Sequence, residues 1–355
     1  MSALSPKKPA PESVAAAPSS PSSPSPPATR RARRSVDPVV LTLLPIIILA
    51  VIVGAVVSPA FLTTTNIIDN IITTSAVLGV LVIAESLILI GGYFDLSLEA
   101  TVGFAPMLLA VLVSGVADSG FGLPFWAGLL IMIPAVLLIG LANGLMIAKL
   151  RLNAFIVTLA MLILLQGLTI GLSGGQTYAM LPDAMTYLGD GVILGLPVQA
   201  WIFVLAFAGA YVFMKLTPTG RSIYAMGGNL EAARAAGIKT TRLTIGVIVA
   251  GSLLAALAGL MLTGRIASVT ANQGNGLIFT VFAAAVIGGI SLNGGRGNLI
   301  GAALGVILLG VIQNILTLSN VPSFWINAAY GAIILAALLV GWVSTQRFSG
   351  RRTPA

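Results

Sequence analysis

Long apolar segments separated by short polar intervals run along almost the entire chain, and they limit what it can fold into. Most of these segments reach the roughly 20 residues that a helix needs to cross the hydrocarbon core of a bilayer. Only 8% of the residues are charged, whereas soluble domains contain about a quarter. The sequence therefore predicts an all-α, polytopic membrane protein with about ten transmembrane helices. The ten segments lie near residues 39–57, 67–90, 98–116, 124–148, 153–172, 198–214, 243–264, 277–290, 299–318 and 324–343.

The eighth segment is short for a membrane-crossing helix, and it runs into the glycine-rich stretch Gly288–Gly297. This pattern predicts a broken or re-entrant helix, which a membrane tolerates only where the backbone is buried in protein or lines a cavity. The first half of the chain has a comparable glycine pair, Gly91-Gly92, after an apolar segment. Five segments in each half, together with this weak internal echo, predict two inverted halves, an arrangement that many transporters share.

The two ends of the chain differ from the rest in composition. Residues 1–36 are rich in Pro, Ser and Ala and end in the basic cluster Arg30–Arg34, so we expect a disordered tail in the cytoplasm. A cleaved signal peptide is the alternative, but the apolar run at 39–57 is longer than the core of a signal peptide. We expect a transmembrane domain over 37–346 and a basic cytoplasmic C-terminal tail over 347–355.

The basic residues predict the orientation. If the N-terminus is cytoplasmic and the chain crosses ten times, 17 of the 18 Lys and Arg fall on the cytoplasmic side, and Arg265 alone falls outside. Short cytoplasmic segments of membrane proteins carry such an excess of positive charge. We therefore expect a multi-pass protein of the cell (inner) membrane with both termini in the cytoplasm. The net charge of +8 is not an indication of nucleic-acid binding, because the basic residues flank apolar segments.

The longest polar interval, residues 215–242, contains five basic residues and one acid. It opens on Thr217–Gly220, residue types that favour a turn. Asn229 as an N-cap and Gly237 as a C-cap predict a short alanine-rich helix between them, with Glu231 in its first turn. A short exposed helix between two membrane segments is either a docking site for a partner protein or a solvated connector, and the residue types leave both open.

Acidic residues within or beside the apolar segments are the first candidates for a functional role. Glu85 lies inside the 67–90 segment, where a carboxylate is costly, so it either lines a solute pathway or is packed in a structural role. Asp95, Ser97 and Glu99 cluster at the start of the third segment and favour helix capping, with Asp95 or Ser97 as the N-cap. In the alternative, the preceding glycine pair lets the backbone approach a substrate or a partner.

Amide side chains are the second group of candidates. Asn143, Gln313 and Asn314 lie in apolar segments, where hydrogen bonds between helices are more common than contacts with a substrate. The polar stretch 272–276 before the eighth segment suits a hydroxyl-rich ligand, but a wet loop has the same composition. The candidate residues for a translocation pathway are Glu85, Asp95, Asn143, Asn272, Gln273, Gln313 and Asn314.

Several chemistries lack their residues in this sequence. The chain contains no Cys and no His, which excludes thiol nucleophiles, disulfides, Cys/His metal sites and histidine acid–base chemistry. The G-x-x-x-x-G-K-[ST] motif for binding ATP does not occur. We therefore expect no enzyme activity, no cofactor and no metal, and the energy for any active transport would enter through another subunit. The alternative is a self-sufficient secondary carrier or channel for a small polar solute, with Glu85 as its coupling site.

Four motifs follow one another along the chain. They are Gly91–Ser97 (GGYFDLS), Asn153–Leu159 (NAFIVTL), Tyr224–Gly237 (YAMGGNLEAARAAG) and Phe282–Gly297 (FAAAVIGGISLNGGRG). In this order, over residues 60–343, the chain resembles the ribose-type (monosaccharide) permeases of ABC importers, and the third motif fits the EAA-x-x-x-G pattern of their cytoplasmic loop. The first motif is one residue longer than the GG-I-DLS of that family. Glu85 and Glu99 stand where the family would have neutral residues, so the identity of the sugar is not carried over.

The resemblance implies the permease subunit of a binding-protein-dependent ABC importer for a sugar or similar hydroxylated small solute. It also implies that the helix of the 215–242 loop docks in a groove of a separate ATPase subunit and transmits the movement of that subunit to the membrane helices. The residues carried over to this coupling site are Gly228, Asn229, Glu231, Ala232, Ala233, Arg234 and Gly237. The implied partners are the ABC ATPase subunit, an extracellular or periplasmic solute-binding protein, a second permease copy (identical or a paralogue) and the lipid bilayer.

Overall fold

The computed structural model describes residues 38–115, 120–322, 324–326, 328–332 and 335. The tail predicted for residues 1–36, most of the tenth apolar segment (324–343) and the basic tail at 347–355 lie outside the described residues, so these predictions stay predictions. All described residues belong to the unit Asp37–Ala355, which forms one set of packed elements.

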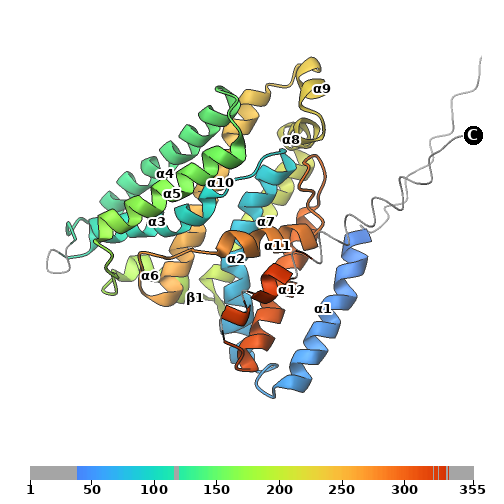
Figure 1. The fold of residues 1–355 in the computed structure, drawn as a ribbon. Helices are drawn as coiled ribbons and strands as arrows, with labels where there is room; N and C mark the ends of the chain where they lie inside the picture. The colour runs from blue at the N-terminus through green and yellow to red at the C-terminus, as the bar shows by residue number, and fades with distance from the viewer. Residues whose placement is uncertain (1–37, 116–119, 323, 327, 333–334, 336–355) are drawn as a thin grey trace, which may run out of the picture. The chain divides into compact units, whose positions relative to one another are not determined.

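The described part of the chain is almost entirely helical, as the apolar segments predict (Figure 1). Its first half contains α1 (Pro38–Val57), a π-helical turn η1 (Asn66–Ile72), α2 (Thr73–Ile90), α3 (Ser97–Val113), α4 (Phe125–Ala148), α5 (Ala154–Ser173) and α6 (Asp183–Asp190). Its second half contains α7 (Val198–Leu216), α8 (Pro218–Gly228), α9 (Leu230–Ala235), α10 (Thr240–Ile266), α11 (Leu277–Ile287) and α12 (Leu299–Leu318). A two-residue hairpin, β1 (Val192–Ile193) with β2 (Leu196–Pro197), precedes α7 and pairs Val192 with Pro197.

Seven helical segments of the described chain are long and apolar enough to cross a membrane. These are α1, η1 with α2, α4, α5, α7, α10 and α12. Two further apolar helices are shorter, α3 with 17 residues and α11 with 11 residues. The short α11 agrees with the prediction for the eighth segment. Ten crossings and two inverted halves remain predictions from the sequence.

α2 is the central helix of this bundle. Its residues between Thr73 and Ile90 are buried almost throughout, and it packs against α7, α10, α11 and α12. A helix that is apolar on all sides is expected in such a position. α1 is the opposite case, because it packs on α12 and leaves large apolar side chains such as Leu41, Ile48 and Val56 exposed.

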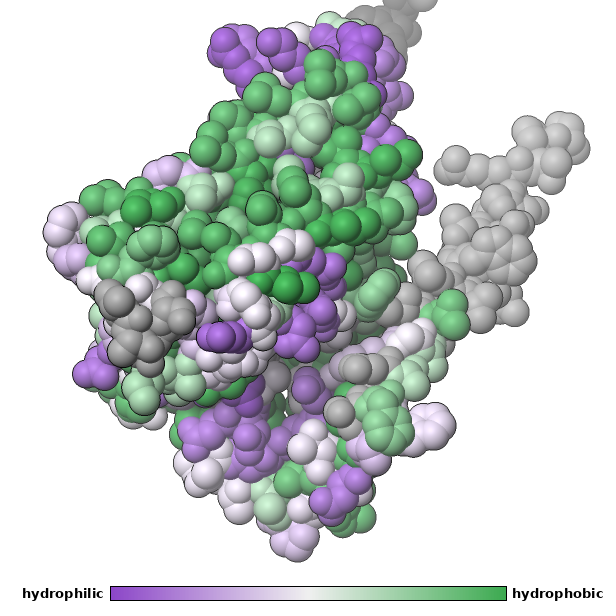
Figure 2. Space-filling model, turned by 60° about the vertical axis from the view of Figure 1, so that its left-hand side comes forward, coloured by the Kyte–Doolittle hydropathy of each residue, from purple (hydrophilic) through white to green (hydrophobic). Residues whose placement is uncertain are grey.

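Large apolar side chains also cover the outside of α4 and α5, among them Leu130, Leu138, Ile156 and Ile163. Figure 2 shows a broad hydrophobic surface below a hydrophilic cap, and the cap lies at the height of α8 and α9 in Figure 1. Soluble proteins rarely expose apolar surface to this extent. This hydrophobic surface is expected of helices that contact lipid or another membrane-embedded chain.

The structure differs from the sequence prediction in one connecting segment and has short elements in another. Thr217–Gly220, predicted as a turn, begins α8: the Thr217 hydroxyl accepts a hydrogen bond from the Gly220 N–H at 3.0 Å, and Pro218 occupies the first turn of the helix. Thr followed by Pro is as suitable for a helix start as for a turn. The loop at 173–197 contains α6 and the hairpin, both too short for the apolar periodicity to identify.

Candidate functional site

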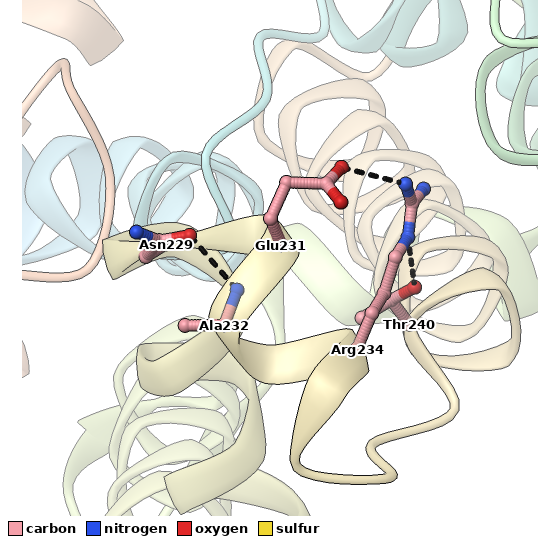
Figure 3. A network of polar contacts seen from close by, with 5 residues as sticks. All are labelled: Asn229, Glu231, Ala232, Arg234 and Thr240. Carbon is pink, nitrogen blue, oxygen red and sulfur yellow. Dashed lines mark hydrogen bonds and ion pairs between the residues drawn. The ribbon is translucent and has the colours of Figure 1, made fainter.

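α9 has the two ends that the sequence predicts. At its start, Asn229 Oδ1 accepts a hydrogen bond from the Ala232 N–H at 2.9 Å (Figure 3). At its end, Gly237 adopts φ +80° and donates its N–H to the Arg234 carbonyl at 2.9 Å. A left-handed backbone conformation of this kind favours glycine, and the bond satisfies a carbonyl that the helix leaves free. The N-cap prediction is therefore confirmed, whereas the C-cap residue is Ala236 and Gly237 is the left-handed residue that follows it.

The polar side chains of α9 form a small network. Arg234 lies 3.0 Å from the Glu231 carboxylate and donates through Nε to the Thr240 hydroxyl at 3.3 Å (Figure 3). The Glu231 side chain is 82% exposed, so the ion pair contributes little to stability. The charged groups of Glu231 and Arg234 therefore remain at the surface, where a partner protein can contact them.

The seven residues predicted for the coupling site lie on this short helix and at its ends. Ala233 is the one that is buried, at 4% exposure, so it lies on the inner side of α9. The other six residues are exposed: Gly228, Asn229, Glu231, Ala232, Arg234 and Gly237. The small side chains make this face smooth and free of protruding groups other than the ion pair, which is suitable for close contact with a second protein.

The end of α8 meets two other segments backbone to backbone. Gly295 donates its N–H to the Ile90 carbonyl at 2.9 Å. Gly227 lies so close to both that a Cβ there would be 1.9 Å from the Ile90 oxygen and 2.6 Å from the Gly295 nitrogen. We call this contact between residues 90–92, 227–228 and 294–295 the glycine junction. The sequence suggested that Gly91-Gly92 let the backbone approach a substrate or a partner. In the structure, the backbone that lies close to this pair belongs to the same chain.

A hydrogen bond beside the glycine junction fastens α8 to the stretch before α12. The Tyr224 hydroxyl donates to the Gly297 carbonyl at 3.0 Å. Burial raises the pKa of the Tyr224 hydroxyl above its usual value, so the group keeps its proton and stays a donor at neutral pH.

A buried polar cluster ties together α2, α3 and α4. Asp95 Oδ1 accepts hydrogen bonds from the Ser97 N–H at 2.9 Å and from the Ser97 hydroxyl at 2.5 Å. Asn143 donates to the same hydroxyl at 2.9 Å, and Glu85 Oε1 accepts from the Asp95 N–H at 3.5 Å. Asp95 thus binds the first N–H of α3, although the N-cap residue of the helix is Leu96 and neither Asp95 nor Ser97 as predicted. Asn143 links two helices, which confirms its expected interhelical role.

Three oxygen atoms of this cluster have no hydrogen-bond donor among the described residues: Glu85 Oε2, Asp95 Oδ2 and Asn143 Oδ1. All three residues are 0% exposed. α2, α3 and α4 contain no Lys or Arg that could neutralise the two acids. The cluster is thus short of donors, and it lines neither of the two cavities described below.

Two further candidates make structural hydrogen bonds. Asn314 of α12 and Asn66 of η1 exchange two side-chain hydrogen bonds at 2.8 and 2.9 Å, which confirms the interhelical role expected for Asn314. Gln273 is buried, and its Nε2 donates to the Thr263 hydroxyl at 2.9 Å and to the Gly259 carbonyl at 3.2 Å. Gln273 therefore does not belong to a wet loop.

Two cavities lie among the membrane helices. The first has a volume of 580 Å³, and we call it the Asn275 cavity; its walls include Thr74, Leu78, Arg265, Asn275, Phe279 and Gln313. The second has a volume of 650 Å³, and we call it the Phe155 cavity; its walls include Tyr93, Phe94, Asn153, Phe155, Phe279 and Phe282. Of the predicted pathway residues, Gln313 lines the first cavity, while Asn272 lines a separate hollow of 310 Å³.

Glu99 has a function that the sequence prediction missed. Its Oε2 accepts a hydrogen bond from the Ile278 N–H at 3.1 Å, in the first turn of α11. Gly276, the N-cap of α11, has no side chain to do this. A carboxylate at a helix N-terminus interacts favourably with the helix dipole. Glu99 therefore caps α11 from α3, and only its unusual place among apolar residues could have signalled this.

Membrane-length apolar helices define a polytopic membrane protein, and the cavities between them together with an exposed helix in a connecting loop are features that suit transport. Residues 67–343 match the family described as branched-chain amino acid transport system / permease component, and the chain belongs to this family. It is thus the permease component of a membrane transport system.

The chain is similar to several curated importer permeases. It is 36% identical to the ribose import permease protein of Bacillus subtilis, over 82% of this chain and 88% of that protein. It is 32% identical to the ribose import permease protein of Haemophilus influenzae, over 82% and 90% of the two chains. It is 33% identical to the L-arabinose ABC transporter permease protein of Azospirillum brasilense, over 79% and 81%. The resemblance found in the four motifs is thereby confirmed. No solved structure matches the chain.

Proposed function

We propose that this chain is the membrane subunit of an ABC importer for a sugar or a similar hydroxylated small solute. The observation that carries the proposal is the similarity to permeases named for ribose and L-arabinose import over about four fifths of the chain. The family description names branched-chain amino acids instead, so the choice between the two kinds of solute needs a direct measurement.

The Asn275 cavity supports a hydroxylated solute. Apolar residues form most of its wall, and hydroxyl and amide groups of Thr74, Asn275, Thr280 and Gln313 lie among them. Such a mixture, with a few polar groups on an apolar wall, is typical of small-molecule sites. Amide groups offer both donors and acceptors, which match the hydroxyl groups of a sugar.

We place the coupling to ATP hydrolysis at α9. Its exposed face, made of small residues and the Glu231–Arg234 pair, fits against a partner protein. From α9 a displacement passes to α8, and the glycine junction carries it to the end of α2 and to the stretch before α12. Because no side chains lie between these backbone segments, a displacement of one segment would be transmitted to the next with little loss.

The distribution of basic residues supports a cytoplasmic position of α9 and of both termini. The ATPase subunit would then bind from the cytoplasm, and a solute-binding protein would deliver the solute on the other side. The exposed apolar surface supports contact with a second permease copy as well as with lipid.

Uptake by reconstituted protein tests this proposal. Proteoliposomes would contain the chain with its ATPase subunit and solute-binding protein, and radiolabelled ribose, L-arabinose and leucine would be offered separately. We expect ATP-dependent uptake of a sugar and none when the ATPase subunit is omitted. Uptake of leucine alone would contradict the sugar assignment. Uptake by the chain alone, driven by an ion gradient, would favour the secondary carrier, for which the buried Glu85–Asp95 cluster is the available coupling site.

A further inference from the structure

The Asn275 cavity and the Phe155 cavity lie along one short helix, α11. The first borders Asn275 and Leu277, just before the helix and at its start. The second borders Val286, near the end of the helix, and Leu292 beyond it. α11 has 11 residues and is therefore about 16 Å long. The two cavities thus occupy successive depths along the same helix.

Phe279 is the one described residue that lines both cavities. Thr280 next to it lines the Asn275 cavity only, and Phe282, one turn further on, lines the Phe155 cavity only. Phe279 is 63% exposed, so the described residues around it leave most of it uncovered. The ring of Phe282, in contrast, packs against Phe94 at a centroid distance of 5.8 Å.

We propose that Phe279 is the gate of the translocation path, the side chain that closes the passage between the two cavities. This inference rests on the proposed function, because a gate requires a path. An apolar ring at a constriction excludes water and therefore stops a hydrated polar solute. Rotation about two side-chain torsions moves the ring aside without any change in the backbone fold.

The ends of α11 connect the gate to the coupling helix. At the start, Gly276 adopts φ +82° and the Glu99 carboxylate binds the Ile278 N–H. At the other end, α11 leads into the stretch 288–298, which contains Gly294 and Gly295 of the glycine junction. A shift of α8 therefore reaches α11 through the backbone, and Phe279 moves with the helix.

Leakage through the assembled importer tests the gate. In proteoliposomes with the ATPase subunit and the solute-binding protein, Phe279→Ala is expected to raise ATP-independent solute uptake several-fold, because the apolar closure is lost. Phe279→Leu keeps an apolar side chain and should remain tight. Phe121→Ala is the matched control, since Phe121 is a comparably exposed phenylalanine that lines neither cavity. A tight Phe279→Ala importer, or equal leakage in Phe121→Ala, would overturn the proposal.

Chemical modification after assembly separates gating from folding. The chain contains no cysteine, so Phe279→Cys provides a single thiol for a bulky thiol reagent. Modification is expected to abolish ATP-driven uptake, and saturating solute should slow the reaction. Undiminished uptake after complete modification would contradict the gate. If the unmodified wild-type importer shows no ATP-driven uptake of any solute, the proposed function fails, whereas active transport with a tight Phe279→Ala variant refutes the gate alone.

Discussion

Gly227 lies where three backbone segments meet, and nothing larger than a hydrogen atom fits there. A Cβ at this position would lie 1.9 Å from the Ile90 carbonyl oxygen. That oxygen is already bound to the Gly295 N–H, so neither neighbour can retreat without breaking the hydrogen bond. Both contacts are with backbone atoms, which cannot relax by changing a rotamer. The residue thus fixes the distance between α8 and α2.

Gly227→Ala is expected to destabilise the protein by about 1–3 kcal/mol, the usual cost of overpacking, and to reduce ATP-driven uptake. Gly209→Ala is the matched control, because a Cβ at Gly209 in α7 meets no atom within 4 Å. Thermal unfolding of both variants in detergent, together with uptake per molecule in proteoliposomes, checks this prediction. Equal stability and uptake in the two variants would show that the glycine junction is not tight.

The buried acidic cluster has more acceptors than donors. Glu85 and Asp95 each have one oxygen without a donor among the described residues, and Asn143 Oδ1 is a third. Unsatisfied buried polar atoms cost free energy. At position 85, a side chain of the same size as glutamate that also carries a hydrogen-bond donor would therefore satisfy one of these oxygen atoms.

Glu85→Gln supplies such a donor and should preserve the melting temperature and the uptake rate. Glu85→Ala leaves the Asp95 N–H without its acceptor and creates a cavity, so a loss of stability of about 2–5 kcal/mol is expected. Thermal unfolding at neutral pH distinguishes the two variants. Loss of all transport in a stable Glu85→Gln protein would instead assign Glu85 a charge-dependent role in the path.

At the scale of the element, α9 depends on its caps and on one buried contact. Six residues are too few for a stable isolated helix, so Asn229, Gly237 and the burial of Ala233 hold it in place. A change at Ala233 therefore displaces the whole exposed face.

Ala233→Leu is expected to abolish ATP-driven uptake while the protein still inserts into the membrane, because the larger side chain pushes α9 away from its support. Ala208→Leu on the exposed side of α7 adds the same bulk where it meets no core and should transport normally. Uptake and the amount of membrane-inserted protein are the two measurements. Normal uptake by Ala233→Leu would remove α9 from the coupling mechanism.

The elements that the sequence predicted depend on local signals. Apolar length identified the membrane helices, and the residue types of Asn229 and Gly237 identified both ends of α9. Long-range contacts have no such local signal. Glu99 binds the N–H of Ile278, which is 179 positions away in the sequence. A pair of glycines is equally compatible with a flexible backbone and with close packing of two backbone segments. Phe279 was missed for the same reason, since its importance follows from two cavities that only the fold creates.

At the scale of the whole molecule, the proposed mechanism has three parts: α9 would receive the movement of the ATPase subunit, the glycine junction would pass it on, and the cavities along α11 would hold the solute. This mechanism requires that α9 face the cytoplasm, because the ATPase subunit would hydrolyse ATP there. The same orientation places 17 of the 18 basic residues on that side.

Labelling of a single cysteine at Ala235, an exposed residue of α9, tests this central claim most directly. The chain has no other cysteine, so a membrane-impermeant maleimide reports one position. The account predicts no labelling of Ala235→Cys in intact cells, rapid labelling in inside-out vesicles stripped of the ATPase subunit, and protection when that subunit is added back. Labelling from outside in intact cells would contradict it.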